Sequence, residues 1–528
     1  MKVPNRNFAE RLIAPLRRTP DNHTFTHTAH LVSAMLKFAP LFLLLCCTTL
    51  AAAEQPYFEI QVVDSETRRG VPLVELTTTH HQTFVTDNSG RITFYEPDLM
   101  GQEVFFSVRS HGYEMPADGF GSRGVRLTPE PGKRAEVRLP RKNIAERMFR
   151  LTGGGKLRDS EMLGHVPTST LNAGVVGQDS VQMAAYQGKL FWFWGDTTLA
   201  RYPLGLFRTS GATTKLLDGQ ALASASGIEL NYFVDKQGQS RAMMPLADDP
   251  AAKEGVVWID GLIIVPDQSG RERMVCRYER RRGLEKQLEQ GIAVWNDEQQ
   301  IFERAVTLKP GEARCLKGHP LRHGEGDQEF VYCGLMFPTL RVPARYEAII
   351  DPEQYEAWTC LDAQQQVVRN DANQPQFAWK PNAKAWTPKL DKQLAASERQ
   401  LLPRDVNGDK SVSLHGGSVR WNKHRQKWIA IGVQEGGTSY LGEVWYSEAD
   451  ALTGPWQKAA KIVTHEKYSF YNPVHHELFD AEDGRVIYFE GTYTYTFSGN
   501  NQATPRYDYN QILYQLDLDN PALRPMRQ

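Results

Sequence analysis

Five carboxylate residues lie where an apolar segment begins or ends, beside glycine, aromatic or histidine residues. They are Asp179, Asp196, Asp260, Glu443 and Glu490. Hydrolysis of a glycosidic bond requires two carboxyl groups that flank the bond, one acting as an acid and the other as a base or nucleophile. We therefore expect two of these five side chains, Asp179 together with Glu490 or Glu443, to perform acid/base catalysis on a sugar.

These residues also have structural interpretations. Asp196 could cap a turn, and Asp260 precedes a glycine, which is a favoured hairpin turn. Glu490 follows apolar residues in an expected strand, where an unpaired carboxylate is costly to bury. It would therefore either pair with a cation such as Arg506 or have a raised pKa, as a general acid requires. Glu443 is the alternative candidate for that acid.

A second set of residues could hold a sugar. It comprises Trp194, Arg341, His415, His475, His476, Arg506 and Tyr507. Because neighbouring residues of a strand point to opposite faces, one of the two adjacent histidines must point inward. An inward histidine could bind substrate, tune an acid or ligate a central cation, or it could be an ordinary buried, hydrogen-bonded histidine.

The elements that must position these residues are short strand pairs, repeated from about residue 151 to the C-terminus. Strands are expected at 180–186, 190–194, 255–265, 272–278, 330–335 and 511–518, and strand pairs at 417–433 and 474–489, the latter with a turn at 482–484. Hairpins at this spacing with no long helix between them indicate radial repetition of an all-β fold. We predict about five blades in residues 156–528, with the last strand closing the ring.

The segment 54–140 predicts a separate β-sandwich, because short runs alternate apolar and polar residues from Phe58 onward. It contains the turn Thr-Asp-Asn-Ser-Gly at 86–90 and a later Gly-Tyr at 112–113. This order resembles the carboxypeptidase regulatory-like (transthyretin-like) domain, which implies an accessory or spacer module. Residues 141–155 are expected to be a linker with a short helix at 143–150, capped by Asn143 and Glu146.

The most informative stretch is 442–456, which reads Gly-Glu-Val-Trp-Tyr-Ser-Glu-Ala-Asp-Ala-Leu-Thr-Gly-Pro-Trp. A strand is followed by an acidic turn and by Gly454 and Pro455, which end it. This pattern resembles a blade of the five-bladed β-propeller glycoside hydrolases, the arabinanase and β-xylosidase superfamily. The resemblance implies a sugar-binding funnel, a general-base aspartate at the place of Asp179 and a central calcium ion near an axial histidine.

Composition narrows the class of function. The 528 residues contain 61 basic and 62 acidic side chains, a balance that argues against a dedicated nucleic-acid partner. No apolar run after residue 53 is long enough to span a bilayer. We therefore expect a polysaccharide or oligosaccharide partner, with no nucleic acid and no membrane span in the mature chain.

The first 53 residues predict targeting rather than fold. Lys37 precedes an apolar run from Phe38 to Leu45, and three alanines end at residue 53, as in a secretory signal peptide. We expect translation to begin at Met35 and the mature protein to be periplasmic or extracellular. A lipoprotein anchored through Cys46 is the alternative.

Four cysteines remain after that cleavage, and an exported location permits disulfides, with three possible full pairings. The sequence thus predicts an exported, two-domain glycoside hydrolase that acts on a polysaccharide, for example a furanoside such as arabinan. The alternatives are a propeller that binds a glycan or a protein without catalysis, and a polysaccharide lyase.

Overall fold

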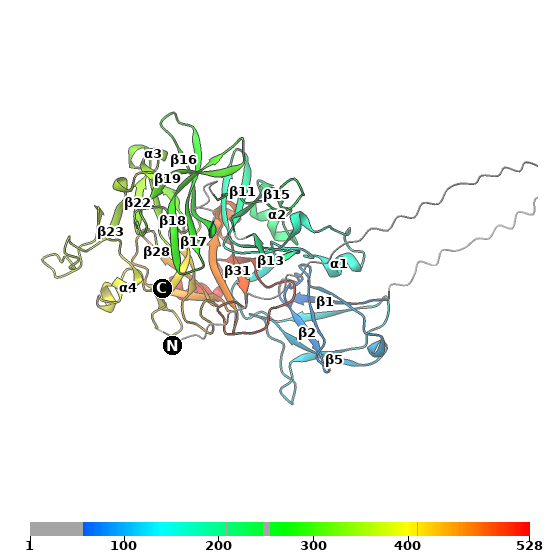
Figure 1. Cartoon of the computed structure of the whole chain (residues 1–528). Coiled ribbons are helices and arrows are strands. Elements are labelled where there is room, and N and C mark those ends of the chain that lie inside the picture. Colours follow the sequence, from blue (N-terminus) through cyan, green and yellow to red (C-terminus); the bar gives the residue numbers. More distant parts are fainter. Residues whose placement is uncertain (1–55, 207, 247–253, 409, 528) are drawn as a thin grey trace, which may run out of the picture. The chain divides into compact units, whose positions relative to one another are not determined.

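The computed structural model describes residues 56–206, 208–246, 254–408 and 410–527. The predicted upstream segment, signal peptide and Cys46 lie outside these residues. Strands dominate throughout, which confirms the all-β class (Figure 1). The four cysteines among the described residues are buried free thiols, so none of the three disulfide pairings between them is formed.

Two small sheets form the N-terminal part. One has the order β4-β1-β7 and the other β3-β2-β5-β6. Their bounds are β1 Phe58–Asp64, β2 Glu75–Thr78, β3 Thr83–Val85, β4 Arg91–Phe94, β5 Val104–Arg109, β6 Gly124–Leu127 and β7 Arg134–Leu139. Alternate residues from both sheets, among them Ile60, Leu76 and Phe106, are buried in one apolar cluster. This part is therefore a two-sheet packing of the kind the alternation predicts, and the family resemblance stays a prediction.

Five further sheets follow, each a meander in which the first strand is innermost. Blade 1 is β10 Gln182–Tyr186, β11 Lys189–Trp194, β14 Ser210–Lys215 and β15 Asn231–Tyr232. Blade 2 is β16 Val256–Pro266, β17 Glu272–Arg282, β18 Lys286–Asn296 and β19 Ile301–Leu308. Blade 3 is β20 Leu321–His323, β21 Phe330–Cys333, β22 Leu340–Pro343, β23 Glu356–Thr359 and β24 Ala378–Pro381.

Blade 4 is β26 Leu414–Asn422, β27 Lys427–Gln434, β28 Val444–Ala449 and β29 Lys458–Val463, with β25 Arg404–Asp405 added in parallel at its outer edge. Blade 5 is β30 Ser469–His475, β31 Val486–Thr494 and β32 Asn510–Asp517, completed by β8 Glu146–Arg150. These five antiparallel sheets are the predicted five blades.

The helix predicted at 143–150 is wrong, because residues 146–150 form the outer strand of blade 5. β8 pairs antiparallel with β32, with Phe149 opposite Leu513. All five residues of β8 are buried, and Met148 and Phe149 join the apolar cluster that includes Trp192 of blade 1. Tertiary burial of this segment therefore overrides its local capping signal. The expected linker is part of the ring.

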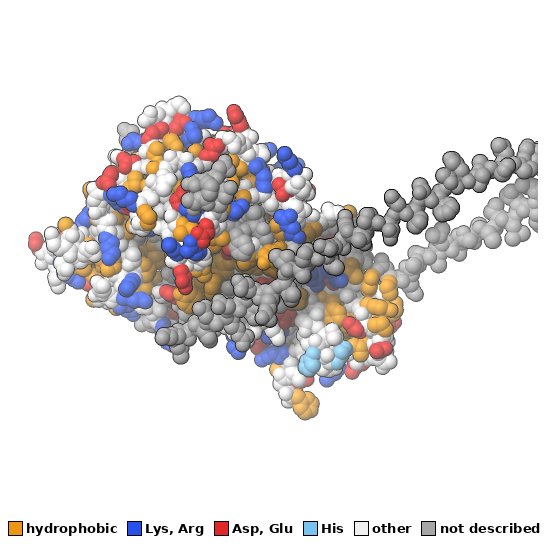
Figure 2. All heavy atoms as spheres, in the orientation of Figure 1, with side chains coloured by type: hydrophobic (Ala, Val, Ile, Leu, Met, Phe, Trp, Pro, Cys, Tyr) orange, Lys and Arg blue, Asp and Glu red, His pale blue; other side chains and the backbone are white. Residues whose placement is uncertain are grey.

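Few other elements interrupt the strands. A small sheet, β9 Val175–Gln178, β12 Thr197–Leu199 and β13 Tyr202–Leu206, lies beside the start of blade 1. The helices are α1 Arg158–Met162, α2 Gly219–Ser224, α3 Tyr346–Ile349 and α4 Pro388–Asp391. Among the described residues no helix is both long enough and apolar enough to cross a membrane. Basic and acidic side chains are interspersed over the face seen in Figure 2, as expected from the balanced composition.

Candidate functional site

The inner strands bring distant parts of the chain to one end of the ring. The β26 and β30 strands are neighbours that run in the same direction. Asn472 lies beside Gly416 near their starts, and the backbone N–H of His475 donates to Ser418 Oγ further along at 2.8 Å. Segments that precede inner strands therefore meet at one mouth of the ring, and segments that follow them meet at the other.

Two of the predicted carboxylates lie together at the first mouth. Asp179 stands between β9 and β10, and Asp196 follows β11. The backbone N–H of Gly195 donates to the Asp179 carbonyl at 2.7 Å, and that of Asp179 donates to the Asp196 carbonyl at 3.3 Å. A Cβ atom on Gly195 would lie only 2.3 Å from Asp179 Oδ1, so the glycine makes room for this carboxyl group.

Their environment raises the pKa of both groups. Burial raises the pKa of Asp179 to about 7, and the negative charge of Asp196 adds to the effect. Burial raises the pKa of Asp196 to about 6. Neither carboxylate has an arginine, lysine or histidine ion-pair partner among the described residues. The pair is thus held in a state in which one proton is gained or lost near neutral pH.

Aromatic side chains from blades 5 and 2 contact this pair. Tyr471 Oη donates to Asp179 Oδ2 at 2.7 Å, and the Tyr509 hydroxyl also hydrogen-bonds Asp179. Trp258 Nε1 donates to Asp196 Oδ1 at 2.7 Å. The ring of Phe497, which is 54% exposed, lies 6.4 Å from that of Tyr471. Half-exposed rings beside a carboxyl pair form a surface suited to the apolar face of a sugar.

His415 lies at the same mouth, at the start of β26. The pairing with β27 shifts between Leu414 and Gly416, so His415 is the extra residue of a β-bulge. Bulges commonly redirect a side chain beside functional sites. His415 is half-buried and has no hydrogen bond or ion pair to any described residue. Asn472, next to Gly416, donates to Ser180 Oγ at 2.7 Å and so connects His415's strand to the residue that follows Asp179.

Two residues predicted for this site have structural surroundings instead. Trp194 is 2% exposed and stacks on Trp192 with ring centroids 6.2 Å apart, so no sugar can reach its face. Asp260 pairs with Arg277 Nη1 at 3.0 Å and accepts the backbone N–H of Gly318 at 3.2 Å. It therefore connects blade 2 to blade 3.

Glu490 and the adjacent histidines lie toward the other mouth, because they are level with or follow the end of β30. Glu490 Oε1 is 2.6 Å from His476 Nε2, and both side chains are almost completely buried. The His476 ring lies 5.7 Å from that of Trp192, so this pair sits between blades 5 and 1. His475 Nε2 is 2.7 Å from Asp480. No hydrogen bond or ion pair between described residues joins these side chains to Asp179.

Glu443 is buried inside a turn of blade 4. Its carboxylate accepts the backbone N–H of Thr438 at 3.0 and 3.1 Å and also the Thr438 hydroxyl. This role stabilises the loop between β27 and β28. The loop in turn supports the site, because Leu441 packs against Tyr471.

The other residues predicted to bind the sugar form contacts away from the carboxyl pair. Arg341, in β22, pairs with Glu356 and lies 4.2 Å above the ring of Phe330. Arg506 Nη1 is 2.7 Å from Asp159 Oδ2, and Tyr507 Oη donates to the Thr86 carbonyl at 2.7 Å. Arg506 and Tyr507 therefore join the N-terminal sheets to the ring.

Basic groups surround His319, and the central calcium ion that the resemblance implies stays a prediction. Arg420 Nη1 donates to the His319 carbonyl at 3.1 Å. Burial, with the charges of Arg420 and His476, lowers the pKa of His319 to about 3. No group of three histidine, cysteine or acidic residues suited to a metal occurs in the described part of the chain. A hard cation prefers several oxygen ligands, which these basic groups do not supply.

Tyr471, Tyr509, Trp258 and Asn472 were missed at the sequence level. Tyr509 lies in the polar aromatic run 504–510 from which Arg506 and Tyr507 were chosen. The nearest sequence signal for Trp258 was its position two residues before Asp260, on the same strand face. Nothing in the local sequence indicates that Tyr471 reaches Asp179.

No protein-family model and no curated protein matches the chain. Solved structures of glycoside hydrolases are similar to it at low identity. The exo-β-1,3-galactanase from Phanerochaete chrysosporium with β-1,3-galactotriose is 11% identical with a TM-score of 0.34, over 65% of this chain and 61% of its own. An exo-1,5-α-L-arabinanase from a bovine ruminal metagenomic library is 11% identical with a TM-score of 0.32, over 66% and 95%.

A family 117 glycoside hydrolase from Zobellia galactanivorans is 10% identical with a TM-score of 0.33, over 71% of this chain and 92% of its own. The match to the galactanase spans about three fifths of that protein's length. Because these identities and TM-scores are low, we derive the function from the residues of the site itself.

Proposed function

We propose that this protein hydrolyses glycosidic bonds of a polysaccharide and that Asp179 and Asp196 are its carboxyl pair. The observation that carries the proposal is the raised pKa of two neighbouring, half-buried carboxyl groups that have no cationic partner among the described residues. A carboxylate that merely stabilised the fold through an ion pair would have a lowered pKa. Glycoside hydrolysis needs one protonated and one ionised carboxyl group in one site.

We assign the acid and the base from the surroundings of the two groups: Asp179 is the more deeply buried, and the negative charge of Asp196 further favours its protonated form. Asp179, with a pKa of about 7, is protonated in about half of the molecules at neutral pH and donates that proton to the oxygen of the departing sugar. Asp196, with a pKa of about 6, is mostly ionised. It acts either as the base that activates a water molecule or as the nucleophile that attacks the anomeric carbon. This assignment reverses the role that the family resemblance implies for Asp179.

The surrounding side chains would position the sugar. Trp258, Phe497 and the two tyrosines offer aromatic surface beside the pair. His415 and Asn472 offer polar contacts from blades 4 and 5. A polysaccharide that contains a furanoside, such as arabinan, is the first substrate to test, and export through the N-terminal segment would bring the enzyme to it.

The deciding experiment measures new reducing ends from plant, algal and bacterial polysaccharides. The mature protein from Glu54 is compared with Asp179→Asn, Asp196→Asn and the matched control Asp260→Asn. We expect one glycan to be cleaved by the wild type and by the control, and turnover to fall about 10²–10⁴-fold in the first two variants. Retained glycan binding without any product would favour a binding protein. Unsaturated products would identify a lyase.

The roles within the pair are tested with aryl glycosides of increasing leaving-group acidity. If Asp179 is the acid, Asp179→Asn regains most of its activity on the most acidic phenol, because that leaving group needs no proton. Asp196→Asn should stay inactive on every aryl glycoside. The opposite pattern would give Asp179 the role of the base.

A further inference from the structure

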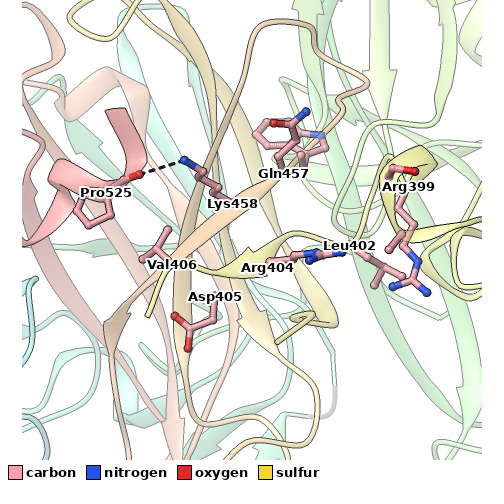
Figure 3. A pocket seen from close by; sticks show the side chains of 11 residues that line it. Arg399, Leu402, Arg404, Asp405, Val406, Gln457, Lys458 and Pro525 are labelled. Atoms are coloured by element: carbon pink, nitrogen blue, oxygen red, sulfur yellow. Dashed lines mark hydrogen bonds between the residues drawn. The ribbon is translucent and has the colours of Figure 1, made fainter. Parts of the chain in front are cut away.

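A cavity lies at the outer edge of blade 4, away from the carboxyl pair. It has a volume of about 480 Å³ and is formed by β25, the start of β29, the segment before β25 and the C-terminal 3-10 helix Pro521–Arg527. Its wall has an apolar part that includes Leu402 and Val406, which are labelled in Figure 3. Trp456 is a further apolar residue of the lining.

Two cationic side chains line this cavity without a carboxylate partner. Lys458 Nζ has one long hydrogen bond, 3.4 Å to the Pro525 carbonyl, and Arg399 Nη1 has one of 3.4 Å to Ser411 Oγ. Neither residue forms an ion pair with any described residue. Bonds of this length are weak, so both cations retain most of their capacity to bind an anion.

Two further donors in the wall are unused. Arg399 Nε and Trp456 Nε1 are buried and have no hydrogen-bond partner in the described part of the chain. Buried donors normally have a partner, and leaving one unpaired costs free energy. Both lining residues therefore have donor capacity that no described group of the protein uses.

The single acidic side chain of the wall does not neutralise them. Asp405 accepts the backbone N–H of Asn407 at 2.9 Å and is thereby turned toward its own loop. Figure 3 shows its carboxylate pointing away from Lys458, and it shows Lys458 and Arg399 on opposite sides of Leu402. The cavity therefore has a positive group on each side of an apolar surface.

We propose that this cavity is a second glycan site, which binds an oligosaccharide through anionic groups on its sugars, either carboxylates or sulfates. That the ligand is an oligosaccharide rests on the proposed function. That the ligand is anionic follows from the two cationic side chains, Lys458 and Arg399. Such a site would hold an acidic polysaccharide on the enzyme while the mouth of the ring acts on it. Two weak contacts on one chain reinforce each other when both can be made at once.

Calorimetry at low salt would test this with four probes: oligogalacturonate, a sulfated galacto-oligosaccharide, a neutral galacto-oligosaccharide of equal length, and inorganic sulfate. The first variant is Lys458→Gln with Arg399→Gln. The control is Lys461→Gln, an exposed lysine on the same strand outside the cavity. Asp179→Asn separates this site from the carboxyl pair.

We expect one acidic oligosaccharide to bind the wild type, the control and Asp179→Asn equally. Its dissociation constant should rise about tenfold for each cation removed, as for the loss of one charge-assisted hydrogen bond. The preferred probe distinguishes carboxylate from sulfate. Unchanged binding in the double variant, equal binding of the neutral probe, or binding of inorganic sulfate alone would each overturn the proposal. Failure of glycan hydrolysis with retained binding here would contradict only the proposed function.

Discussion

Tyr471 and Asp179 are 292 residues apart, yet the tyrosine hydroxyl donates a 2.7 Å hydrogen bond to the carboxylate. The contact joins the inner strand of blade 5 to the segment that begins blade 1. It favours the ionised form of Asp179 and so opposes the effect of burial on the pKa of that group. A side chain of blade 5 therefore affects the pKa of the carboxyl group that precedes blade 1.

Replacing Tyr471 by Phe is expected to raise the pKa of Asp179 further, because an interaction with the ionised form is lost. Since Asp179 must be protonated as the acid, the alkaline limb of kcat/KM should move to higher pH. The measurement is the pH profile of the wild type and the variant. Tyr186→Phe is the control, because Tyr186 donates to Asp297 and lies at the opposite end of β10 from Asp179. An unchanged alkaline limb would remove Asp179 from the acid's role.

The profile of the wild type should itself be bell-shaped. Below about pH 6 the base Asp196 becomes protonated, and above about pH 7 the acid Asp179 becomes ionised. Activity should therefore be highest between these values, with both limbs belonging to the coupled pair rather than to one residue. A profile that stays flat from pH 5 to about pH 9 would contradict the assignment.

The same pair should make the fold less stable as the pH rises. The folded pKa of Asp179 lies above its unfolded value of about 3.9, so the folded state binds more protons between these pH values. Stability is then lost as pH rises through about 4 to 7. Asp179→Asn cannot ionise and should be about 1–3 kcal/mol more stable than the wild type at pH 8, with little difference at pH 4. Urea unfolding at the two pH values measures this, and equal differences at both would contradict the raised pKa.

Variants of Glu490 test whether this carboxylate has a structural or a catalytic role. Because it is buried with His476, Glu490→Ala should cost about 3–5 kcal/mol of stability, and Glu490→Gln, which keeps a hydrogen bond, should cost less. The kcat of folded Glu490→Gln should match that of the wild type. A loss of kcat in a variant of normal stability would restore Glu490 as a catalytic candidate.

The contact between the N-terminal sheets and the ring can be measured through Arg147. This buried residue of β8 donates to the carbonyl groups of Pro72 at 3.1 Å and His111 at 3.0 Å. We expect one calorimetric transition for the wild type and a loss of about 2–4 kcal/mol in Arg147→Leu, since buried acceptors would be left unpaired. Two separate transitions in the wild type would show instead that the sheets unfold independently, as a spacer module would.

The sequence predicts the ring well, since its strands alternate and are separated by recognisable turns. The boundaries of β11, β17 and β28 follow from such patterns. It also selects Asp179, Asp196 and His415, which share one mouth. Sequence reasoning fails where a contact between residues far apart in the chain decides the role of a side chain. Glu490 resembles an acid in sequence, but only the fold shows His476 beside it.

The same limit explains the error at 143–150. The capping residues Asn143 and Glu146 favour a helix locally, whereas the neighbour that makes this segment a strand is β32, more than three hundred residues later. Local propensity cannot include such a partner. The contact of Tyr471 with Asp179 could not be predicted for the same reason, since the two residues are far apart in the sequence.

The pairing of β8 with β32 also has a consequence for the order in which the chain can fold. During synthesis β8 emerges early, and its partner strand is among the last to appear. The ring therefore stays open, with the edges of blade 5 and blade 1 unprotected, until almost the whole chain has been made. Closing so long a loop is slow and exposes unpaired strand edges to other chains. We infer that the nascent protein depends on protection from aggregation until its two distant ends meet.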